Sequence, residues 1–428
     1  MESLLFLVIQ WVAIAFLGLM LFLALFEPPL PYRLSPVEWS ALSSPEFRRT
    51  LAALAGGEVH DGNRVEVLTN AAAYYEAELE AISQARHHIN LEAYIFQKGR
   101  VTRRFVDALV ERARAGVQVR LVLDAVGCFA TWDSYFDELK AAGGQFAFYH
   151  PIRLHTLPRI NNRTHRELIV IDGVVGFLGG SGFADHWAYP HGRGDRKPAW
   201  RDTMFRVEGP VVGDLQSVFV ENWLESAGEL LADPAFFPPG SPLGTSLAFV
   251  VGSSPTTGGS TRARMLFQGL LAAARKSIHI TSPYFLPDAS ATTELVRAVE
   301  RGVEVKVITP GRHTDHLLTQ RSSRRLFGPL LRAGATIFEY EPAMIHAKTM
   351  VVDGCWSVVG STNFDNRSFG INDEVNLVAF DPRLAERLEE DFARDLAQSR
   401  RVTYRKWYRR PIFERVHEWL GALLERQQ

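Results

Sequence analysis

The sequence predicts an α/β fold in which two similar lobes follow an apolar N-terminal helix. Three observations carry this prediction: strand-like and helix-like segments alternate, their order returns in the second half, and a continuous apolar run opens the chain. The 428 residues are 46% hydrophobic and 22% charged, which is typical of a folded globular protein. This length favours two or three domains.

The apolar run extends from Leu4 to Phe26, with Gln10 as its only clearly polar side chain. It is longer than the roughly 20 helical residues that cross a bilayer core. A cleaved signal peptide would have a basic start and a shorter apolar region, whereas this run follows Met-Glu-Ser and ends at Glu27. We therefore expect a retained single-pass transmembrane anchor.

Strand-like and helix-like segments alternate after the anchor. Such alternation is typical of an α/β fold with a largely parallel or mixed central sheet. The segments are 64–68 (strand), 74–85 (helix), 88–96 (strand), 103–116 (helix) and 117–124 (strand).

The second half of the chain repeats the first. In each half, a histidine then opens an apolar strand that ends in Asp-Gly, so the simplest explanation is a duplicated lobe. The similar segments are 85–96 and 274–286, 114–124 and 300–310, and 141–151 and 332–342.

These patterns divide the chain into six parts, with Pro-rich, Gly-rich and Ser-rich stretches as connectors. The parts are an anchor at 1–27, a linker with an approach helix at 28–56, a first lobe at 57–235, an inter-lobe linker at 236–262, a second lobe at 263–399 and a basic amphipathic segment at 400–428.

Charge and cysteine content exclude several classes of protein. The 47 Lys and Arg residues nearly balance the 48 Asp and Glu residues, which leaves a net charge of −1 and argues against a duplex nucleic-acid-binding protein. Two cysteines, Cys128 and Cys355, exclude a disulfide-dense scaffold and a four-cysteine zinc site.

The strongest motif is His346-Ala-Lys348, which opens a strand ending at Asp353. Residues i and i+2 of a strand share a face, so the imidazole and the ammonium group project together. A nucleophilic or acidic imidazole then lies beside a cation able to hold phosphate oxygens. Downstream, Ser361 and Asn363 add polar groups next to an open glycine backbone, and we expect both to contact the substrate.

The first half carries a matching motif with two departures. His165, Asp172 and Gly180 stand at the positions of the histidine, the aspartate and the serine of the second copy. Glu167 replaces the lysine, and Gly182 replaces the asparagine. We expect Glu167 and Gly180 to line the substrate site.

The second motif, read through Gly-Ser-x-Asn, Arg367-Ser368 and Glu374, resembles the H-x-K-x4-D motif of the phospholipase D superfamily. The flanking RAGATIFEYEPAMIHAKTMVVDG and GSTNFDNRSFGINDEVNL look most like bacterial cardiolipin synthase-like members. The resemblance covers roughly residues 60–405. It implies that the two motifs form one site, in which one histidine forms a phosphohistidine and the other acts as acid and base, without a metal or other cofactor.

By this resemblance His165 is the nucleophile, His346 is the acid-base group and Lys348 stabilises charge. A carboxylate should orient each imidazole through its second ring nitrogen. We expect Asp202, which lies in the same half, to orient His165, and Glu374 to orient His346. The aspartates of the two motifs, Asp172 and Asp353, should fix the backbone of the strand-to-turn connection.

Glu167 weakens this scheme because it puts a carboxylate where the family has a cation. Two unit charges about 4 Å apart interact by about 4 kcal/mol at an effective dielectric near 20. Arg166 cannot replace the lysine, since adjacent strand residues point to opposite faces. Three alternatives remain open for Glu167: it pairs with Lys348, it is protonated, or it binds a glycerol hydroxyl. A decayed first half-site is the alternative to a catalytic His165.

The resemblance implies cardiolipin synthase-like transfer of a phosphatidyl group between anionic phospholipids, with phosphatidylglycerol as the expected substrate. The alternatives are a hydrolytic phospholipase D and a catalytically impaired phospholipid-binding protein. We expect location in the bacterial inner membrane and no nucleic-acid partner. Basic residues only after the anchor favour a cytoplasmic catalytic part; they are Arg33, Arg48 and Arg49.

Two basic regions have an open role. Between Arg400 and Arg410 the chain has six basic residues, which form either a solvated terminal helix or a contact with anionic lipid headgroups. A second group of arginines could recognise a second phosphate or simply lie on the surface of a helix; it comprises Arg312, Arg321, Arg324 and Arg325.

Overall fold

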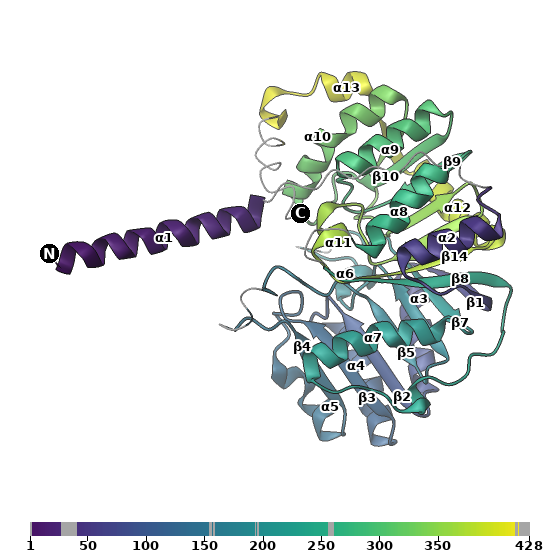
Figure 1. Ribbon diagram of the computed structural model, residues 1–428. Coiled ribbons are helices and arrows are strands. Elements are labelled where there is room, and N and C mark those ends of the chain that lie inside the picture. The colour runs from purple at the N-terminus through teal and green to yellow at the C-terminus, as the bar shows by residue number, and fades with distance from the viewer. Residues whose placement is uncertain are drawn as a thin grey trace.

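The structure is a computed structural model that describes residues 2–26, 41–153, 156, 159–192, 194, 197–255, 261–415 and 418. One sheet of 15 strands runs through both halves of the chain, in the order β15-β11-β10-β9-β12-β13-β14-β8-β1-β7-β6-β5-β2-β3-β4. Figure 1 shows the two halves one above the other.

The strands of the first half are β1 (His60–Thr69), β2 (His88–Ala93), β3 (Gln118–Asp124), β4 (Gln145–Tyr149), β5 (Leu168–Ile171), β6 (Val175–Gly179) and β7 (Thr203–Glu208). Its helices are α3 (Ala71–Ser83), α4 (Arg100–Arg114), α5 (Asp137–Ala141), α6 (Asp185–Ala188) and α7 (Val212–Ala227).

The strands of the second half are β8 (Ser246–Ser253), β9 (Ser277–Thr281), β10 (Glu304–Pro310), β11 (Thr336–Tyr340), β12 (Thr349–Val352), β13 (Trp356–Gly360), β14 (Glu374–Phe380) and β15 (Ser399–Val402). Its helices are α8 (Arg262–Ala273), α9 (Ala289–Glu300), α10 (Leu317–Ala333), α11 (Asn366–Gly370), α12 (Pro382–Ala397) and α13 (Tyr404–Tyr408).

The strand order repeats on the two sides of the β1–β8 pair, which joins the halves in antiparallel register. From this pair outward, β1-β7-β6-β5-β2-β3-β4 corresponds to β8-β14-β13-β12-β9-β10-β11. The β2-β3-β4 and β9-β10-β11 pairs are parallel, whereas the other pairs of these two series are antiparallel. The predicted mixed α/β fold with a central sheet is therefore confirmed.

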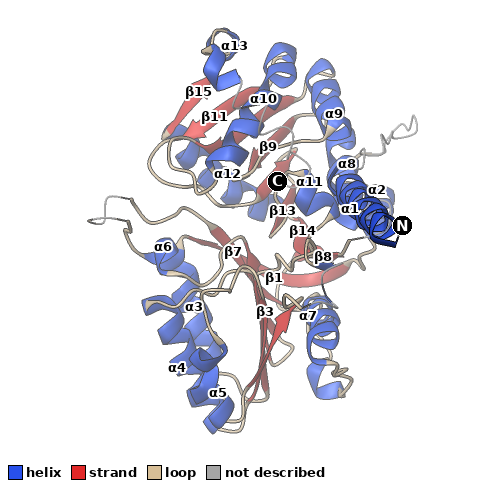
Figure 2. Cartoon of the chain, turned by 90° about the vertical axis from the view of Figure 1, so that its left-hand side faces the viewer, coloured by secondary structure: helices blue, strands red, loops and turns tan. Residues whose placement is uncertain are grey.

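Helices cover both faces of each half of the sheet. In Figure 2, α3, α4 and α5 lie on one side of the first half and α7 on the other, while α12 and α8 flank the second half. A continuous core cluster joins the halves, since Leu178 and Phe205 of β6 and β7 share it with Val359 and Leu377 of β13 and β14. All four side chains are buried. This shared core holds the two motif regions in one rigid arrangement.

The predicted linker at 28–56 contains a helix that belongs to the second-half core. Helix α2 (Pro45–Ala55) begins at Ser44, whose hydroxyl accepts a hydrogen bond from the Phe47 amide at 3.1 Å. Phe47 packs edge-on against Trp356 with ring centroids 5.7 Å apart, and the Trp356 indole donates to the Leu42 carbonyl at 3.0 Å. Residues 27–40 of the predicted linker lie outside the described part of the chain.

The prediction of an inter-lobe linker at 236–262 is wrong in its middle, because β8 runs through it. Prolines and glycines mark both ends of the segment, but the intervening SLAFVV run is apolar and pairs with β1 on one side and β14 on the other. The connectors are therefore shorter than predicted. The other lobe limits stay predictions.

The predicted anchor coincides with helix α1 (Glu2–Phe26), which extends away from the rest of the molecule in Figure 1. Side chains in this helix are described for residues 6–20, and all of them are exposed. Within the described residues, the structure contains no helix that is both long and apolar enough to span a bilayer. The transmembrane anchor stays a prediction.

The basic C-terminal segment begins as part of the sheet rather than as a separate element. Strand β15 pairs with β11, where Arg400 forms ion pairs with Glu339 at 2.6 Å and Glu341 at 3.1 Å. In α13, the Trp407 indole donates to the Arg324 carbonyl at 2.7 Å. Contact between the exposed basic residues of α13 and lipid stays a prediction, and most of 411–428 is either exposed or outside the described residues.

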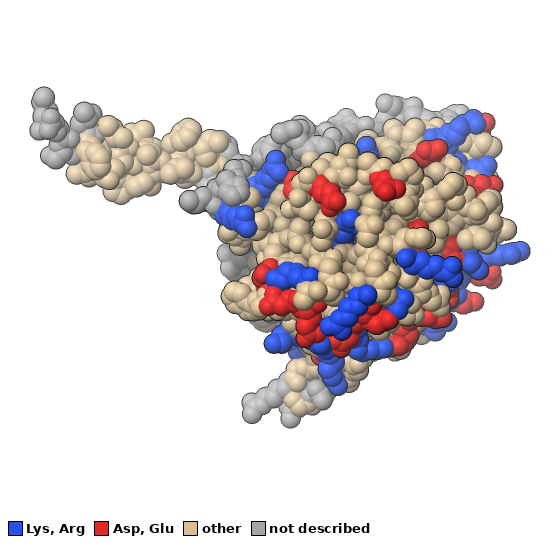
Figure 3. Space-filling model, turned by 90° about the horizontal axis from the view of Figure 1, so that it is seen from below, with Lys and Arg blue, Asp and Glu red and all other residues tan. Residues whose placement is uncertain are grey.

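Charges of both signs are interspersed on the molecular surface. On the face drawn in Figure 3, Lys and Arg side chains alternate with Asp and Glu side chains. Exposed ion pairs in the described chain include Arg103 with Glu138 at 2.9 Å and Lys140 with Asp133 at 3.0 Å. Such exposed pairs contribute little to stability, on the order of 0–1 kcal/mol each.

Candidate active site

Two short backbone pairings between the halves bring the motif histidines together. His165 precedes β5, and its amide donates to the Asp373 carbonyl at 2.9 Å, just before β14. His346 precedes β12, and its amide donates to the Arg201 carbonyl at 2.7 Å, just before β7. Each histidine is therefore held against the segment that precedes a central strand of the other half.

These pairings decide which carboxylate orients which imidazole. The His165 Nδ1 atom lies 3.1 Å from both carboxylate oxygens of Glu374, and the His346 Nδ1 atom lies 3.0 Å from Asp202 Oδ2. The predicted assignment, Asp202 with His165 and Glu374 with His346, is wrong. The partners cross between the halves because Glu374 follows the segment paired with His165, and Asp202 follows the segment paired with His346.

Buried hydrogen bonds hold both carboxylates in place. The Ser361 hydroxyl donates to Glu374 Oε2, and the Trp187 indole donates to Asp202 Oδ2 at 2.9 Å. The Ser361 hydroxyl is thus buried against Glu374, and Ser361 is not among the residues that line the pocket described below. Contact of Ser361 with substrate stays a prediction. Burial alone would raise the pKa of Asp202, but the hydrogen bond with His346 and the charges of His346 and Lys348 hold this pKa below its usual value.

Lys348 lies directly against His346. Its Nζ atom is 2.9 Å from Nδ1 and 3.0 Å from Nε2 of the imidazole, and it donates to the His346 carbonyl at 2.9 Å. Burial lowers the pKa of Lys348 to about 8. Burial and the charge of Lys348 lower the pKa of His346, so the ligand-free site favours a neutral imidazole.

Both histidines open into one pocket of about 450 Å³ between the halves. Its lining includes polar side chains from both motifs and from the elements that follow them. Among these are His165, His346, Glu167, Gly180, Asn363 and Arg367. Asn363 and Gly180 both line the pocket, and the Oδ1 atom of Asn363 is buried without a hydrogen-bond partner among the described residues. Their contact with substrate stays a prediction.

The carboxyl group of Glu167 is buried in the wall of this pocket. Its Oε1 atom accepts hydrogen bonds from the amides of Tyr94 at 3.2 Å and Ile95 at 3.3 Å, while Oε2 has no hydrogen-bond partner in the described structure. Burial raises the pKa of Glu167 well above its usual value. Within the described residues Glu167 forms no ion pair with Lys348. The raised pKa favours the protonated form, and the alternative that Glu167 binds a hydroxyl is compatible with it.

The two departures of the first motif are connected by packing. A Cβ atom at Gly182 would lie 2.7 Å from the Ile95 carbonyl oxygen and 2.9 Å from Glu167 Oε1. An asparagine at this position, as in the second motif, would displace the backbone of Ile95 or the carboxyl group of Glu167. The glutamate and the glycine therefore form one local arrangement.

The motif aspartates lie away from the pocket and hold backbone turns. Asp172 has a φ of 52° and accepts hydrogen bonds from the amides of Arg86, His87 and His88, all at 2.8 Å. Asp353 has a φ of 54° and accepts from the amides of residues 275–277 in the same way. Each carboxylate fixes the entry to the strand next to its motif.

Aromatic side chains that the sequence analysis missed surround both imidazoles. Tyr94 packs edge-on against His165 at 5.2 Å, and Trp187 and Trp200 pack against His346 at 5.5 and 5.3 Å between ring centroids. The only sequence signals were Trp200 in the WRDT segment and a tyrosine at the end of the same strand in both repeats. These rings shield the imidazoles from water.

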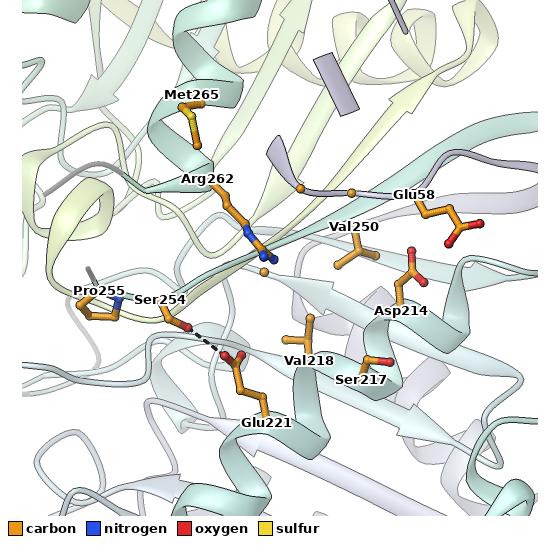
Figure 4. Close-up of a pocket in the computed structure, with 13 residues that line it drawn as sticks. Glu58, Asp214, Ser217, Val218, Glu221, Val250, Ser254, Pro255, Arg262 and Met265 are labelled. Carbon is orange, nitrogen blue, oxygen red and sulfur yellow. Dashed lines mark hydrogen bonds between the residues drawn. The ribbon is translucent and has the colours of Figure 1, made fainter. Parts of the chain in front are cut away.

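Arg166 points to the opposite side of its strand, as expected from strand geometry. Its fully buried guanidinium donates to the Val218 carbonyl at 2.9 Å, to Glu221 at 2.7 Å and to Ser254 at 3.2 Å. Glu221 and Ser254 line a second cavity of about 780 Å³, in which Figure 4 shows their side chains turned toward each other. Arg166 therefore bonds to Val218 and Glu221 of α7 and does not line the pocket.

Solved structures share this architecture. Phosphatidylserine synthase from Haemophilus influenzae Rd KW20 matches with a TM-score of 0.69 at 13% sequence identity, covering 90% of this chain and 100% of that one. At this identity the match shows the fold alone.

Sequence comparison shows the family. The family model described as "Cardiolipin synthase, PLD-like domain" matches residues 79–189 and 268–396. The major cardiolipin synthase ClsA of Bacillus subtilis (strain 168) is 34% identical over 367 residues, which cover 85% of this chain and 75% of that protein. The cardiolipin synthase of Geobacillus kaustophilus (strain HTA426) is 34% identical over 399 residues, covering 91% and 78%. The chain belongs to this family of phospholipase D-like enzymes.

Proposed function

We propose that the chain is a membrane-anchored phosphatidyltransferase that joins two anionic phospholipids by cardiolipin synthase-like transfer, with phosphatidylglycerol as donor and acceptor. The supporting observation is the pair of histidines that open into one pocket, each hydrogen-bonded to a buried carboxylate from the other half. The similarity to named cardiolipin synthases supports the same reaction.

In the first half-reaction, His165 attacks the donor phosphorus through Nε2, because Glu374 holds its Nδ1 atom. The bond from phosphorus to the oxygen of the headgroup glycerol breaks, and His346 gives its Nε2 proton to this leaving alkoxide. The phosphatidyl group stays on His165. His346 is neutral before the donor binds, but an anionic phosphodiester beside Lys348 raises the pKa of both groups. Protonation of His346 thus accompanies donor binding.

In the second half-reaction, the acceptor hydroxyl loses its proton to His346 and attacks the phosphorus of the phosphohistidine. The phosphorus–nitrogen bond breaks, which restores His165. Two phosphatidylglycerol molecules thereby give cardiolipin and free glycerol. A positioned general acid and base of this kind contributes about 10²- to 10⁴-fold to the rate.

Glu167 and Asn363 support the proposed choice of a glycerol headgroup. Each has a buried side-chain oxygen without a hydrogen-bond partner among the described residues, and each lines the pocket. A bound hydroxyl group would satisfy such an atom, whereas an apolar substituent would leave it unpaired at a cost of about 1–3 kcal/mol. We propose that both side chains bind hydroxyl groups of the donor or acceptor alcohol.

The proposed location is the bacterial inner membrane, with α1 as a single-pass anchor. The length and apolar sequence of residues 4–26 support this assignment. Retention near the bilayer would keep the pocket close to substrates that do not leave the membrane.

Incubation of the purified full-length protein with phosphatidylglycerol vesicles, followed by mass analysis of lipids and glycerol, tests the proposed reaction. Cardiolipin with an equal amount of glycerol is the expected result. Phosphatidic acid as the main product would identify a hydrolytic phospholipase D, since water competes with the alcohol for the same intermediate. The absence of turnover would identify a lipid-binding protein.

A further inference from the structure

A small cavity of about 140 Å³ lies beside the active-site pocket, between the two halves. The segment after α6 contributes Lys197 and Trp200, and the connection from β10 to α10 contributes Arg312, His313 and Asp315. The proposed reaction has not used this cavity.

Positive charge in this cavity is not balanced by ion pairs. Among the described residues, no carboxylate lies within ion-pair distance of Arg312 or Lys197. The Arg312 Nε atom donates to His313 Nε2 at 3.1 Å, which leaves the terminal guanidinium nitrogens available. Burial and the charges of Arg312 and Lys197 lower the pKa of His313, and the charge of Glu341, which forms an ion pair with Arg400, raises it.

The one carboxylate in the lining, Asp315, faces the active-site pocket. It accepts a hydrogen bond from the Tyr284 hydroxyl at 2.5 Å and lies 3.9 Å from His316 Nε2. By contrast, two other arginines that the sequence singled out, Arg321 and Arg324, lie within 4 Å of Glu414. Arg312 is thus placed to bind an external anion.

The cavity is directly connected to the catalytic centre. Trp200 lines it and packs against the His346 imidazole at 5.3 Å between ring centroids, and Met344 lines it two residues before His346. Asp315 lines both this cavity and the active-site pocket. A group bound here would lie next to a group that reacts at His346.

We propose that this cavity binds the phosphodiester of the phospholipid that supplies the acceptor alcohol, while the donor phosphodiester lies between His165 and His346. This inference rests on the proposed transferase function. In the product, the two phosphodiesters are separated only by the three carbons of one glycerol, so the second one must lie close to the first. Arg and Lys groups that face one anion form charge-assisted hydrogen bonds with its oxygens.

Neighbouring apolar residues favour a phospholipid over free phosphate as the source of this anion. Leu317 and Leu318 open α10 directly after the cationic connection, and their exposed fractions are 60% and 45%. Leu318 also lines the active-site pocket. A cationic cavity beside exposed leucines suits a phosphodiester that carries acyl chains.

An assay with one donor and two different acceptors can distinguish binding of the acceptor phosphodiester from a general role in catalysis. With phosphatidylglycerol as donor, isotopically labelled glycerol measures transfer to an alcohol without phosphate, and cardiolipin formation measures transfer to a phosphodiester-bearing alcohol. We expect Arg312→Gln and Lys197→Gln each to lower cardiolipin formation by about tenfold or more, as loss of a charge-assisted hydrogen bond predicts. Exchange of labelled glycerol should stay close to the wild-type rate.

Arg114→Gln is the matched control, because Arg114 is exposed at the end of α4 and has no part in either cavity. It removes the same charge from the surface and should change neither rate. An equal loss of both reactions in Arg312→Gln, or no loss of either, would overturn the proposal. If Arg312→Gln weakens calorimetric binding of inorganic phosphate but leaves cardiolipin formation intact, the cavity is a free-phosphate site and the lipid assignment is wrong.

The wild-type protein distinguishes failure of this inference from failure of the proposed function. A wild-type protein that exchanges glycerol or hydrolyses phosphatidylglycerol but makes no cardiolipin would refute the transferase itself. A wild-type protein that makes cardiolipin, together with variants that respond equally to both acceptors, would refute only the second phosphodiester site.

Discussion

The Glu167→Gln variant tests whether the carboxyl group of Glu167 is neutral or ionised in the folded protein. Glutamine keeps the Oε1 atom that accepts from Tyr94 and Ile95, and its amide nitrogen replaces Oε2, which has no partner in the described structure. If Glu167 is protonated, its hydroxyl donates from this same place, so Glu167→Gln should keep most of the cardiolipin-forming activity. Glu167→Ala should lose it together with stability, since two buried amides lose their acceptor at about 1–3 kcal/mol each.

The pH dependence of protein stability shows how much free energy of unfolding is linked to the proton on Glu167. Because burial raises the pKa of Glu167, the folded protein keeps a proton that the unfolded chain releases above about pH 4.3. The stability linked to this proton is complete below the unfolded pKa and is lost as pH rises towards the folded pKa, by up to about 1.36 kcal/mol per pH unit. Glutamine has no proton to release, so the variant should gain stability relative to the wild type as pH rises from about 5 to 7.

Thermal unfolding of both full-length proteins at several pH values, together with cardiolipin assays at the same values, tests this reasoning. A Tm difference between wild type and Glu167→Gln that stays constant from pH 5 to 7 would show that Glu167 is already ionised there. Loss of activity in Glu167→Gln as severe as in Glu167→Ala would show that the site needs a carboxylate rather than a hydrogen-bond donor. Either result refutes the neutral form.

A related variant, Glu167→Lys, tests whether the first motif is simply decayed. A cation at this position would face Lys348, whose pKa burial has already lowered to about 8. Like charges about 4 Å apart repel by about 4 kcal/mol at an effective dielectric near 20. Deprotonation of one lysine and lower activity are therefore expected, and higher activity on simple phosphodiesters would support decay.

The other predictions concern the remaining catalytic groups and the anchor. His346→Ala should abolish turnover, and Lys348→Ala should lower kcat by about 10²- to 10³-fold, as expected for loss of a preorganised charge; an active His346→Ala protein would remove the enzymatic interpretation. Rapid quenching followed by peptide mass analysis should find the phosphatidyl group on His165, and its discovery on His346 would reverse the two roles. The full-length protein should remain in the membrane fraction after alkaline and high-salt washing, and a variant without residues 1–27 should not.

Sequence periodicity was sufficient for the fold because it reports local structure and burial. Alternating strands and helices and the repeated order of segments predicted the duplicated α/β arrangement, whereas β8 was hidden between Pro-rich and Gly-rich ends. The family resemblance likewise implied that Asp172 and Asp353 hold the backbone, and the structure shows both accepting hydrogen bonds from backbone amides. Periodicity and repeated segment order are local features of the sequence, so they can be recognised without knowing which segments pair.

Contacts between the halves were not predictable in this way. The crossed pairs His165–Glu374 and His346–Asp202 span 209 and 144 residues. They depend on two isolated backbone bridges that no periodic pattern marks. Position within a repeat also gave no sign that the Ser361 hydroxyl donates to Glu374, the carboxylate that holds a histidine of the other half.

Two residues of the first motif differ from the second, Glu167 and Gly182. Their packing favours one joint change of role over the separate loss of a lysine and an asparagine. Decay would release residues separately, yet the Gly182 backbone leaves room for the Glu167 carboxyl group, and two amides hold that group in the pocket wall. Around it, His165 keeps its carboxylate, and Asp172 keeps all three of its backbone contacts. A pair of identical motifs would place two lysines at one phosphodiester. The two motifs instead provide one lysine, Lys348, and one buried carboxyl group, Glu167, which under the proposed function binds an alcohol hydroxyl.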